Sequence, residues 1–104
     1  MKLHFLRYFV VLAEELHFGR AASKLAITQP PLSCAIKALE EELEVQLLIR
    51  DSKHVELTQA GGAFLEEARQ ILEQVARASN VAKIVARGMR GRLEIEDQAG
   101  IGRV

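Results

Sequence analysis

Apolar residues recur at helical spacing through the first 43 residues of the chain. Within 3–13 they fall three and four positions apart, which places them on one face of an amphipathic helix. The segment 18–25 repeats this spacing after a break at Leu16 and His17. A tight connection over 26–28 leads to a third segment, whose inward stripe is Leu32, Ile36, Leu39 and Leu43. The pattern predicts three short helices around an apolar core.

The third helix has a recognisable beginning. Thr28 can serve as its N-cap, because a hydroxyl accepts hydrogen bonds from the free N–H groups of a first turn. Proline costs little in that turn, where N–H groups lack partners within the helix. We therefore expect the small and polar residues that follow to lie on or beside the outer face of the helix: Gln29, Pro30, Pro31, Ser33, Cys34 and Lys37.

A hairpin and a long helix are predicted next. Two β-prone runs, 46–50 and 55–57, flank a polar loop at 51–54. Thr58 offers another cap, and no proline interrupts 59–87. A helix of about 30 residues is about 45 Å long, whereas a domain of about 57 residues is only about 25–30 Å across. We therefore expect the far half of this helix to find no partner in its own chain.

The predicted long helix also carries a heptad pattern. Its apolar positions step alternately by four and three, as in a coiled coil: Phe64, Ala68, Ile71, Val75, Ala78, Ala82 and Val85. A second copy of the helix is the simplest partner for this stripe, which predicts a homodimer. The alternative is a single solvated helix, which the continuous apolar stripe disfavours.

Length and composition limit the classes of protein. The 104 residues allow one compact domain with an appendage. No apolar run approaches the roughly 18 residues of a membrane span, and no signal peptide is evident. The single cysteine, Cys34, excludes an intramolecular disulfide and suits a reducing cytoplasm. His4, His17 and His54 are too dispersed for a metal site, and no nucleophile–base pair supports an enzyme.

Charge neither supports nor excludes a nucleic-acid partner. Lys and Arg number 14, as do Asp and Glu, so the chain lacks the basic balance typical of bulk DNA binding. A DNA contact needs only a local basic face, however. The position of each charge therefore matters more than the sum.

The first three helices have the features of a helix-turn-helix. Ala21 and Ala22 are small enough for two helices to cross closely, and the second helix of such a unit can enter the major groove of DNA. There Gln29 can form a bidentate pair with adenine, and the hydroxyls of Thr28 and Ser33 can reach phosphates or bases. Prolines can touch a thymine methyl group.

The hairpin would then be a wing, with Arg50, Lys53 and His54 directed at the DNA backbone. Each feature also has an ordinary interpretation. Most small three-helix domains do not bind DNA, Gln29 can be a simple first-turn residue, and the basic loop can be a solvated turn. From the residues alone both interpretations stay open.

Many residues also match one family in order and spacing. They are Leu6-Arg7-Tyr8-Phe9, Ala13-Glu14, Phe18, Arg20-Ala21-Ala22, Leu25, Thr28-Gln29-Pro30-Pro31-Leu32-Ser33, Ile36, Leu39-Glu40, Leu43, Leu47-Leu48, Arg50 and Leu57-Thr58-Gln59-Ala60-Gly61. Over about residues 3–88, the chain resembles the N-terminal half of a LysR-type transcriptional regulator.

The resemblance implies a mainly α fold, in which a winged helix-turn-helix (three helices and a two-stranded wing) precedes one long dimerisation helix. It implies sequence-specific binding to a double-stranded DNA operator and control of transcription from the bacterial cytoplasm, without catalysis or a membrane. It assigns base reading to the outer face of the third helix: Gln29, Pro30, Pro31, Ser33, Lys37 and, by position, Cys34. Backbone contacts fall to Arg20, Thr28, Arg50, Lys53 and the neighbouring His54.

The resemblance also divides the chain into 1–57 for DNA binding, 58–88 for the dimerisation helix, and 89–104 as a stub of an effector-binding domain, which we expect to be mobile. Its first strand would begin at 92–96. We expect no cofactor in this chain, since a small-molecule inducer would need a full effector domain. Full-length relatives also form dimers of dimers, and RNA polymerase is a further candidate partner. The competing function is a helical dimerisation or protein-interaction module that does not bind nucleic acid.

The sequence departs from the family in three places. Cys34 replaces a longer polar or basic residue. His17-Phe18-Gly19 replaces a Ser-Phe-Thr opening, from which we expect the loss of a good helix cap. Glu44 replaces a glycine after Leu43, so the connection to the wing is expected to differ.

Overall fold

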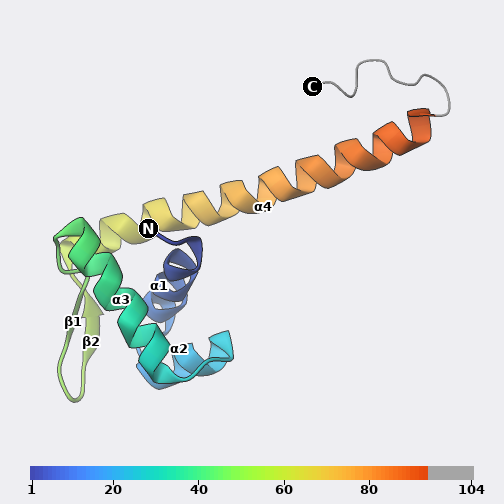
Figure 1. The fold of residues 1–104 in the computed structure, drawn as a ribbon. Helices are drawn as coiled ribbons and strands as arrows, with labels where there is room; N and C mark the ends of the chain where they lie inside the picture. Colours follow the sequence, from blue (N-terminus) through green and yellow to red (C-terminus); the bar gives the residue numbers. More distant parts are fainter. Residues whose placement is uncertain (94–104) are drawn as a thin grey trace. The chain divides into compact units, whose positions relative to one another are not determined.

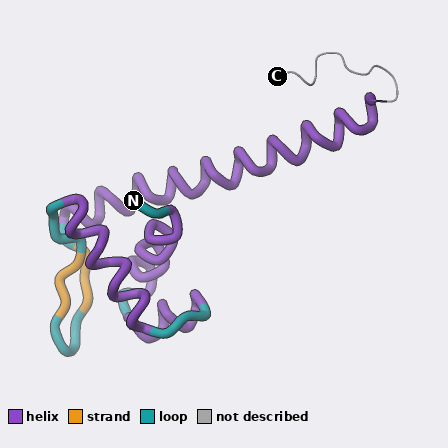
Figure 2. Tube along the Cα trace, viewed as in Figure 1, coloured by secondary structure: helices purple, strands orange, loops and turns teal. Residues whose placement is uncertain are grey.

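The computed structural model describes residues 1–93 of the chain. It contains the three predicted short helices, the hairpin and the long helix, in the predicted order (Figure 1). The elements are α1 (Leu3–Glu15), α2 (Phe18–Leu25), α3 (Gln29–Leu43), β1 (Leu48–Arg50), β2 (Val55–Leu57) and α4 (Gln59–Leu93). Figure 2 shows the only strands of the described residues in the hairpin. The predicted fold class, a mainly helical winged helix-turn-helix followed by a long helix, is confirmed.

One apolar core joins α1, α2, α3 and the base of the hairpin. Its largest fully buried side chains are Phe9, Leu12, Leu32, Leu39 and Leu47. The methyl groups of Ala21 and Ala22 are also buried, where small side chains let helix backbones approach closely. The predicted inward stripe of α3 is therefore correct through Leu39, and Leu43 packs at the edge of the core.

Each of the three short helices ends on a non-glycine residue in the left-handed region. Leu16, Ala26 and Glu44 have φ values of 50°, 58° and 58°, and their N–H groups bond back to carbonyls of the last turn. A residue with a Cβ adopts this conformation at a cost of about 1–2 kcal/mol. Glu44 thus makes the sharp turn after α3 without the freedom of a glycine.

Two predictions about helix caps are wrong. His17 does cap α2, because its Nδ1 accepts a hydrogen bond from the Arg20 N–H at 3.0 Å. Thr28 occupies the N-cap position of α3, but its side chain makes no capping hydrogen bond. The prolines that follow remove N–H donors from the first turn, which leaves the Thr28 hydroxyl less to bond there.

The hairpin is short and firmly attached at its base. Its strands pair in antiparallel register, with Leu48 opposite Leu57 and Arg50 opposite Val55. The first strand starts two residues later than the expected 46, because the N–H groups of Leu47 and Leu48 donate to Glu40 Oε2 at 2.8 and 3.2 Å instead. This carboxylate ties the last turns of α3 to the start of the wing.

Thr58 and Gly61 lock the other end of the wing to α4. The Thr58 hydroxyl donates to the Gln46 carbonyl at 2.6 Å and accepts from the Gly61 N–H at 2.9 Å, so the predicted cap at Thr58 is confirmed. Gly61 is buried against the Leu47 carbonyl, so closely that a Cβ there would stand 2.0 Å from its oxygen. Glycine is therefore a steric requirement at this position.

The first turns of α4 complete the core. Leu65 and Ala68 are buried, and the Phe64 ring lies 5.4 Å from the Phe9 ring, centroid to centroid. The compact unit extends through Leu72, and α4 from Glu73 belongs to a second unit.

The predicted dimer stripe needs a correction at its start. Ala68 has no exposed surface, and Phe64 packs on its own core, so neither leads the exposed stripe. Exposed apolar side chains begin at Ile71 and Val75 and continue to Val85.

The long helix also runs further than expected. It ends at Leu93 rather than at 88, and includes the first two residues of the strand predicted at 92–96. A glycine inside a helix costs only about 1 kcal/mol, so the glycines in this segment do not end it. The rest of the predicted stub, 94–104, lies outside the described residues.

Candidate nucleic-acid interface

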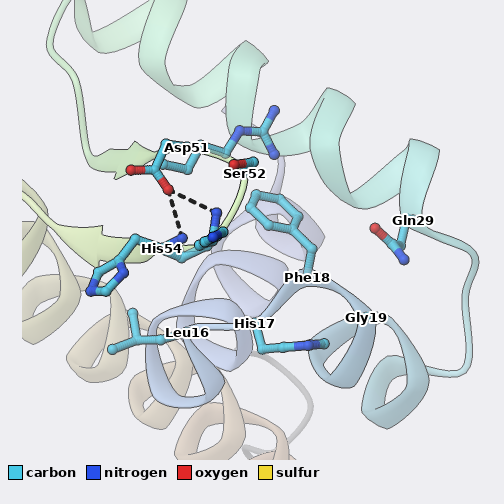
Figure 3. A pocket seen from close by; sticks show the side chains of 11 residues that line it. Leu16, His17, Phe18, Gly19, Gln29, Asp51, Ser52 and His54 are labelled. Carbon is cyan, nitrogen blue, oxygen red and sulfur yellow. Dashed lines mark hydrogen bonds between the residues drawn. The ribbon is translucent and has the colours of Figure 1, made fainter.

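A polar groove lies between the start of α2, the start of α3 and the wing. Its volume is about 560 Å³. It is lined by four residues predicted to meet DNA, Gln29, Arg50, Lys53 and His54, and also by His17, Gly19 and Asp51 (Figure 3). Residues more than twenty positions apart in the sequence thus share one surface.

The outer face of α3 is open, as predicted. Gln29, Pro30, Pro31, Cys34 and Lys37 are exposed, and Ser33 is half-buried at the flank. A second groove, of about 330 Å³, follows the side of this helix toward β1 and is lined by Ser33, Cys34, Lys37 and Arg50 among others. The structure therefore brings the predicted base-reading residues to one helix face beside the wing.

Arg50 borders both grooves and is held by an aromatic ring. Its guanidinium carbon lies 4.3 Å from the centroid of the Phe18 ring. This cation–π contact joins the wing to the first turn of α2 and restricts the guanidinium while leaving Arg50 exposed. Phe18 was not among the predicted site residues, since an apolar residue at helical spacing signals only core packing.

A carboxylate shapes the tip of the wing. Asp51 Oδ1 accepts hydrogen bonds from the backbone N–H groups of Lys53 and His54, both at 2.8 Å. These two bonds lower the pKa of the Asp51 carboxyl below its ordinary value. Lys53 and His54 are exposed beyond this turn. The tip is thus a fixed loop with basic side chains outside and one anion at its base.

Arg20 is tethered rather than free. Its Nε lies 3.4 Å from Glu15 Oε1, and its guanidinium donates to the Glu15 carbonyl at 3.3 Å. Lys24 pairs with the same carboxylate at 2.7 Å. The hydrogen bond from Lys24 is the main cause that lowers the pKa of Glu15, and Arg20 makes a smaller contribution. The same hydrogen bond raises the pKa of Lys24. Sequence analysis missed this cluster, because Glu15 ends one helix and its partners lie on the next.

The two signs of charge are segregated along α3. Lys37 stands on the exposed face near the middle of the helix, whereas Glu41, Glu42 and Glu44 are exposed at its C-terminal end. The neutral sum of the whole chain therefore conceals a basic and polar surface around the wing.

In the part of the chain that the structure describes, no group of three His, Cys, Asp or Glu side chains is placed to hold a metal ion. None of the described helices combines the length and the apolar character that crossing a membrane requires.

This arrangement defines a winged helix-turn-helix, and comparison with known proteins identifies the family. Residues 3–62 match the family model described as "Bacterial regulatory helix-turn-helix protein, lysR family". The chain therefore belongs to the LysR family of transcriptional regulators, which are not enzymes, and it contains the family's DNA-binding domain with its linker helix.

Relatives and solved structures agree with this assignment. The chain is 52% identical over 95 residues to the HTH-type transcriptional regulator AlsR of Bacillus subtilis, a match that covers 91% of this chain and 32% of AlsR. It is 52% identical over 96 residues to XapR of Escherichia coli, covering 89% of this chain and 32% of XapR. The chain thus spans about a third of the length of these relatives.

Several similar structures contain DNA, and among them are two of DNA-binding domains alone on DNA. One is the DNA-binding domain of CbnR in complex with DNA, with a TM-score of 0.80, 42% identity, and coverage of 83% of this chain and 99% of that one. The other is the BenM DNA-binding domain on its catB site 1 DNA, with a TM-score of 0.80, 46% identity, and coverage of 83% and 97%.

Proposed function

We propose that this chain binds double-stranded DNA sequence-specifically as a homodimer and regulates transcription in the manner of a LysR-type regulator. The observation that carries the proposal is the convergence of Gln29 on α3 with Arg50 and Lys53 on the wing around one groove. This groove combines a side chain able to read a base with cations able to hold phosphates. The DNA complexes of CbnR and BenM support it by similarity.

Base reading falls to the exposed face of α3. Gln29 stands at its first position, where the residues of a recognition helix reach base edges. Pro30, Pro31, Ser33, Cys34 and Lys37 share that face. The free hydroxyl of Thr28 is available to a phosphate, since it makes no capping bond.

Backbone contacts fall to the cations around the grooves. Arg50 is oriented by Phe18, and Lys53 and His54 project from a turn fixed by Asp51. Arg20 is oriented by Glu15. Side chains that are already ordered lose less entropy on binding, so these contacts favour a defined docking geometry.

The homodimer rests on the exposed apolar residues of α4 from Ile71 onward. Ile71, Val75 and Val85 are 42%, 38% and 50% exposed, and Ala78 and Ala82 lie between them in the heptad. Val81 and Ile84 are also exposed, which widens the apolar surface beyond the predicted stripe. A second copy of the helix would remove this surface from water, at about 25 cal/mol per Å².

In a full-length protein, two such dimers would form a tetramer, and each chain would carry an inducer-binding domain. RNA polymerase would be a further partner. Binding to the chromosome places the chain in the bacterial cytoplasm. The competing function, a dimerisation module without DNA, is favoured by the same apolar stripe but uses no residue of the grooves. The two functions therefore make different predictions for the groove residues.

A salt titration separates them. The duplex is the sequence that the chain enriches from a randomised double-stranded library, with a scrambled duplex as control. Gln29→Ala should weaken binding to the enriched duplex by about 1–3 kcal/mol and relax preference at one base pair. Lys53→Ala should weaken both duplexes alike and lower the salt slope by about one. A chain that enriches no sequence from the library and binds no DNA at low salt would leave the dimerisation module as its function.

Sedimentation tests the homodimer independently. Val75→Asp should give a monomer, because a buried unpaired carboxylate costs several kcal/mol. Glu73→Asp, a change between acids at an exposed position two residues away, is the control and should stay dimeric. A Val75→Asp chain that remains dimeric would place the interface elsewhere.

A further inference from the structure

Gly19 stands between the His17 ring and the Gln29 amide. A Cβ built at Gly19 would lie 3.0 Å from His17 Cε1, 3.4 Å from His17 Nδ1 and 3.6 Å from Gln29 Nε2. Gly19 belongs to the first turn of α2, whereas Gln29 begins α3. In Figure 3 the Gln29 side chain projects from α3 toward the segment that holds Gly19.

The His17 side of this contact has little freedom to move. Its Nδ1 accepts the hydrogen bond from the Arg20 N–H that caps α2, which requires the ring proton to sit on Nε2. A side chain at position 19 would push on the ring edge and strain the cap. The ring forms one wall of the groove, and a side chain added at Gly19 would lie between this wall and Gln29.

A glutamine that reads adenine needs a defined amide orientation. Both the carbonyl oxygen and the NH₂ group must meet the base edge in one plane. A Cβ at 3.6 Å from Nε2 would make an ordinary van der Waals contact with the amide. Side-chain atoms beyond a Cβ would compete for the volume that the amide occupies, so Gly19 permits an orientation that a side chain longer than that of alanine would restrict.

We propose that Gly19 is a specificity-determining residue, which sets the orientation of the Gln29 amide from the neighbouring helix although Gly19 has no side chain to contact DNA. The proposal rests on the proposed DNA binding and names a residue that governs its selectivity. Gly19 is therefore a positioning residue, because it acts on DNA recognition only through Gln29.

The test compares base preferences selected from a randomised double-stranded DNA library. The key variant is Gly19→Thr in a His17→Ser background, because serine retains a capping oxygen and removes the ring that would otherwise clash. His17→Ser alone is the reference. Gly62→Thr is the matched control, since it adds the same residue near the start of α4, where a Cβ meets nothing within 4 Å. Gln29→Ala identifies the base pair that Gln29 reads.

We expect Gly19→Thr to change preference by at least about fivefold at the base pair identified by Gln29→Ala, with other positions unaltered. Gly62→Thr should keep the wild-type preferences, and the preferences of His17→Ser are the reference against which the double variant is compared. Thermal unfolding checks that the double variant folds, and Gly19→Ser in the same background, which also places an atom beyond Cβ, replaces it if it does not.

The failures are distinguishable. Base preferences that match those of His17→Ser, or a uniform loss at all positions, would overturn the role of Gly19. A Gln29→Ala chain with wild-type preferences would overturn it too, while leaving DNA binding standing. A wild-type chain that enriches no sequence would overturn the proposed function itself, and this inference with it.

Discussion

Two adjacent glycines at the start of α4 should respond in opposite ways to alanine. A Cβ at Gly61 would stand 2.0 Å from the Leu47 carbonyl oxygen, 3.0 Å from its carbon and 3.2 Å from Leu57 Cδ2. A Cβ at Gly62 would meet nothing within 4 Å. Both positions are helical, so the intrinsic gain in helix propensity is the same for both.

The magnitude follows from these contacts. Carbon–oxygen contacts are normally about 3.3 Å or longer, so Gly61→Ala forces a backbone shift of more than about 1 Å. The Leu47 carbonyl accepts the Thr58 N–H at 3.0 Å, and losing a buried hydrogen bond costs about 1–3 kcal/mol. Overpacking adds about 1–3 kcal/mol, and helix propensity returns about 1 kcal/mol. The net loss therefore lies between about 1 and 5 kcal/mol, with a midpoint of about 3 kcal/mol.

Thermal unfolding by circular dichroism, at equal protein concentrations, measures both variants. Gly61→Ala should lower Tm by roughly 10–25 °C for a domain of this size. Gly62→Ala should raise the free energy of unfolding by about 0.5–1 kcal/mol. A Gly61→Ala chain within a few degrees of wild type would refute the close approach to Leu47. Equal losses in both variants would trace the effect to the helix start in general.

Three further changes test other parts of the domain. Glu44→Gly should stabilise the fold by about 0.5–1 kcal/mol in urea unfolding, because glycine adopts a φ of 58° without the left-handed penalty; an unchanged midpoint would show that Glu44 carries no strain. The pKa of Glu15 is lowered in the folded protein, chiefly by Lys24. The ionised Glu15 therefore stabilises the fold at pH values above its ordinary pKa of 4.5, and this contribution is lost as the pH falls through the lower pKa of the folded state. Glu15→Gln should therefore flatten acid unfolding over that range, and curves of identical slope would contradict the ion pairs. A maleimide adduct at exposed Cys34 should abolish DNA binding while preserving the helical circular dichroism signal, and bound duplex should slow the labelling; equal labelling rates with and without DNA would move Cys34 off the interface.

Local chemistry explains why so much of the fold could be read from the residues. The apolar stripe of α3, the position of its two prolines and the cap at Thr58 are properties of neighbouring residues, and the structure confirms each of them. The helices, the hairpin and their order follow from patterns of this kind. The family resemblance added the arrangement of the helices, which spacing alone leaves open.

The errors have two sources, an unusual capping group and contacts between distant segments. His17 caps α2 through a ring nitrogen, which no capping preference favoured. Ala68 matched the exposed heptad in spacing, but it is buried by α4 packing on its own domain. A helical pattern identifies an apolar face and cannot say whether that face meets the same chain or a partner.

The sequence by itself determined that this chain is a mainly helical winged helix-turn-helix with a long appended helix, because side-chain periodicity, caps and turn residues act over a few positions. The tertiary structure decided how the candidate interface is assembled. Phe18 orients Arg50 across 32 positions, and Gly61 admits the Leu47 carbonyl. It also places Gly19 against Gln29. Such contacts depend on how helices cross and where the wing folds back, and those geometries arise only when the whole core packs.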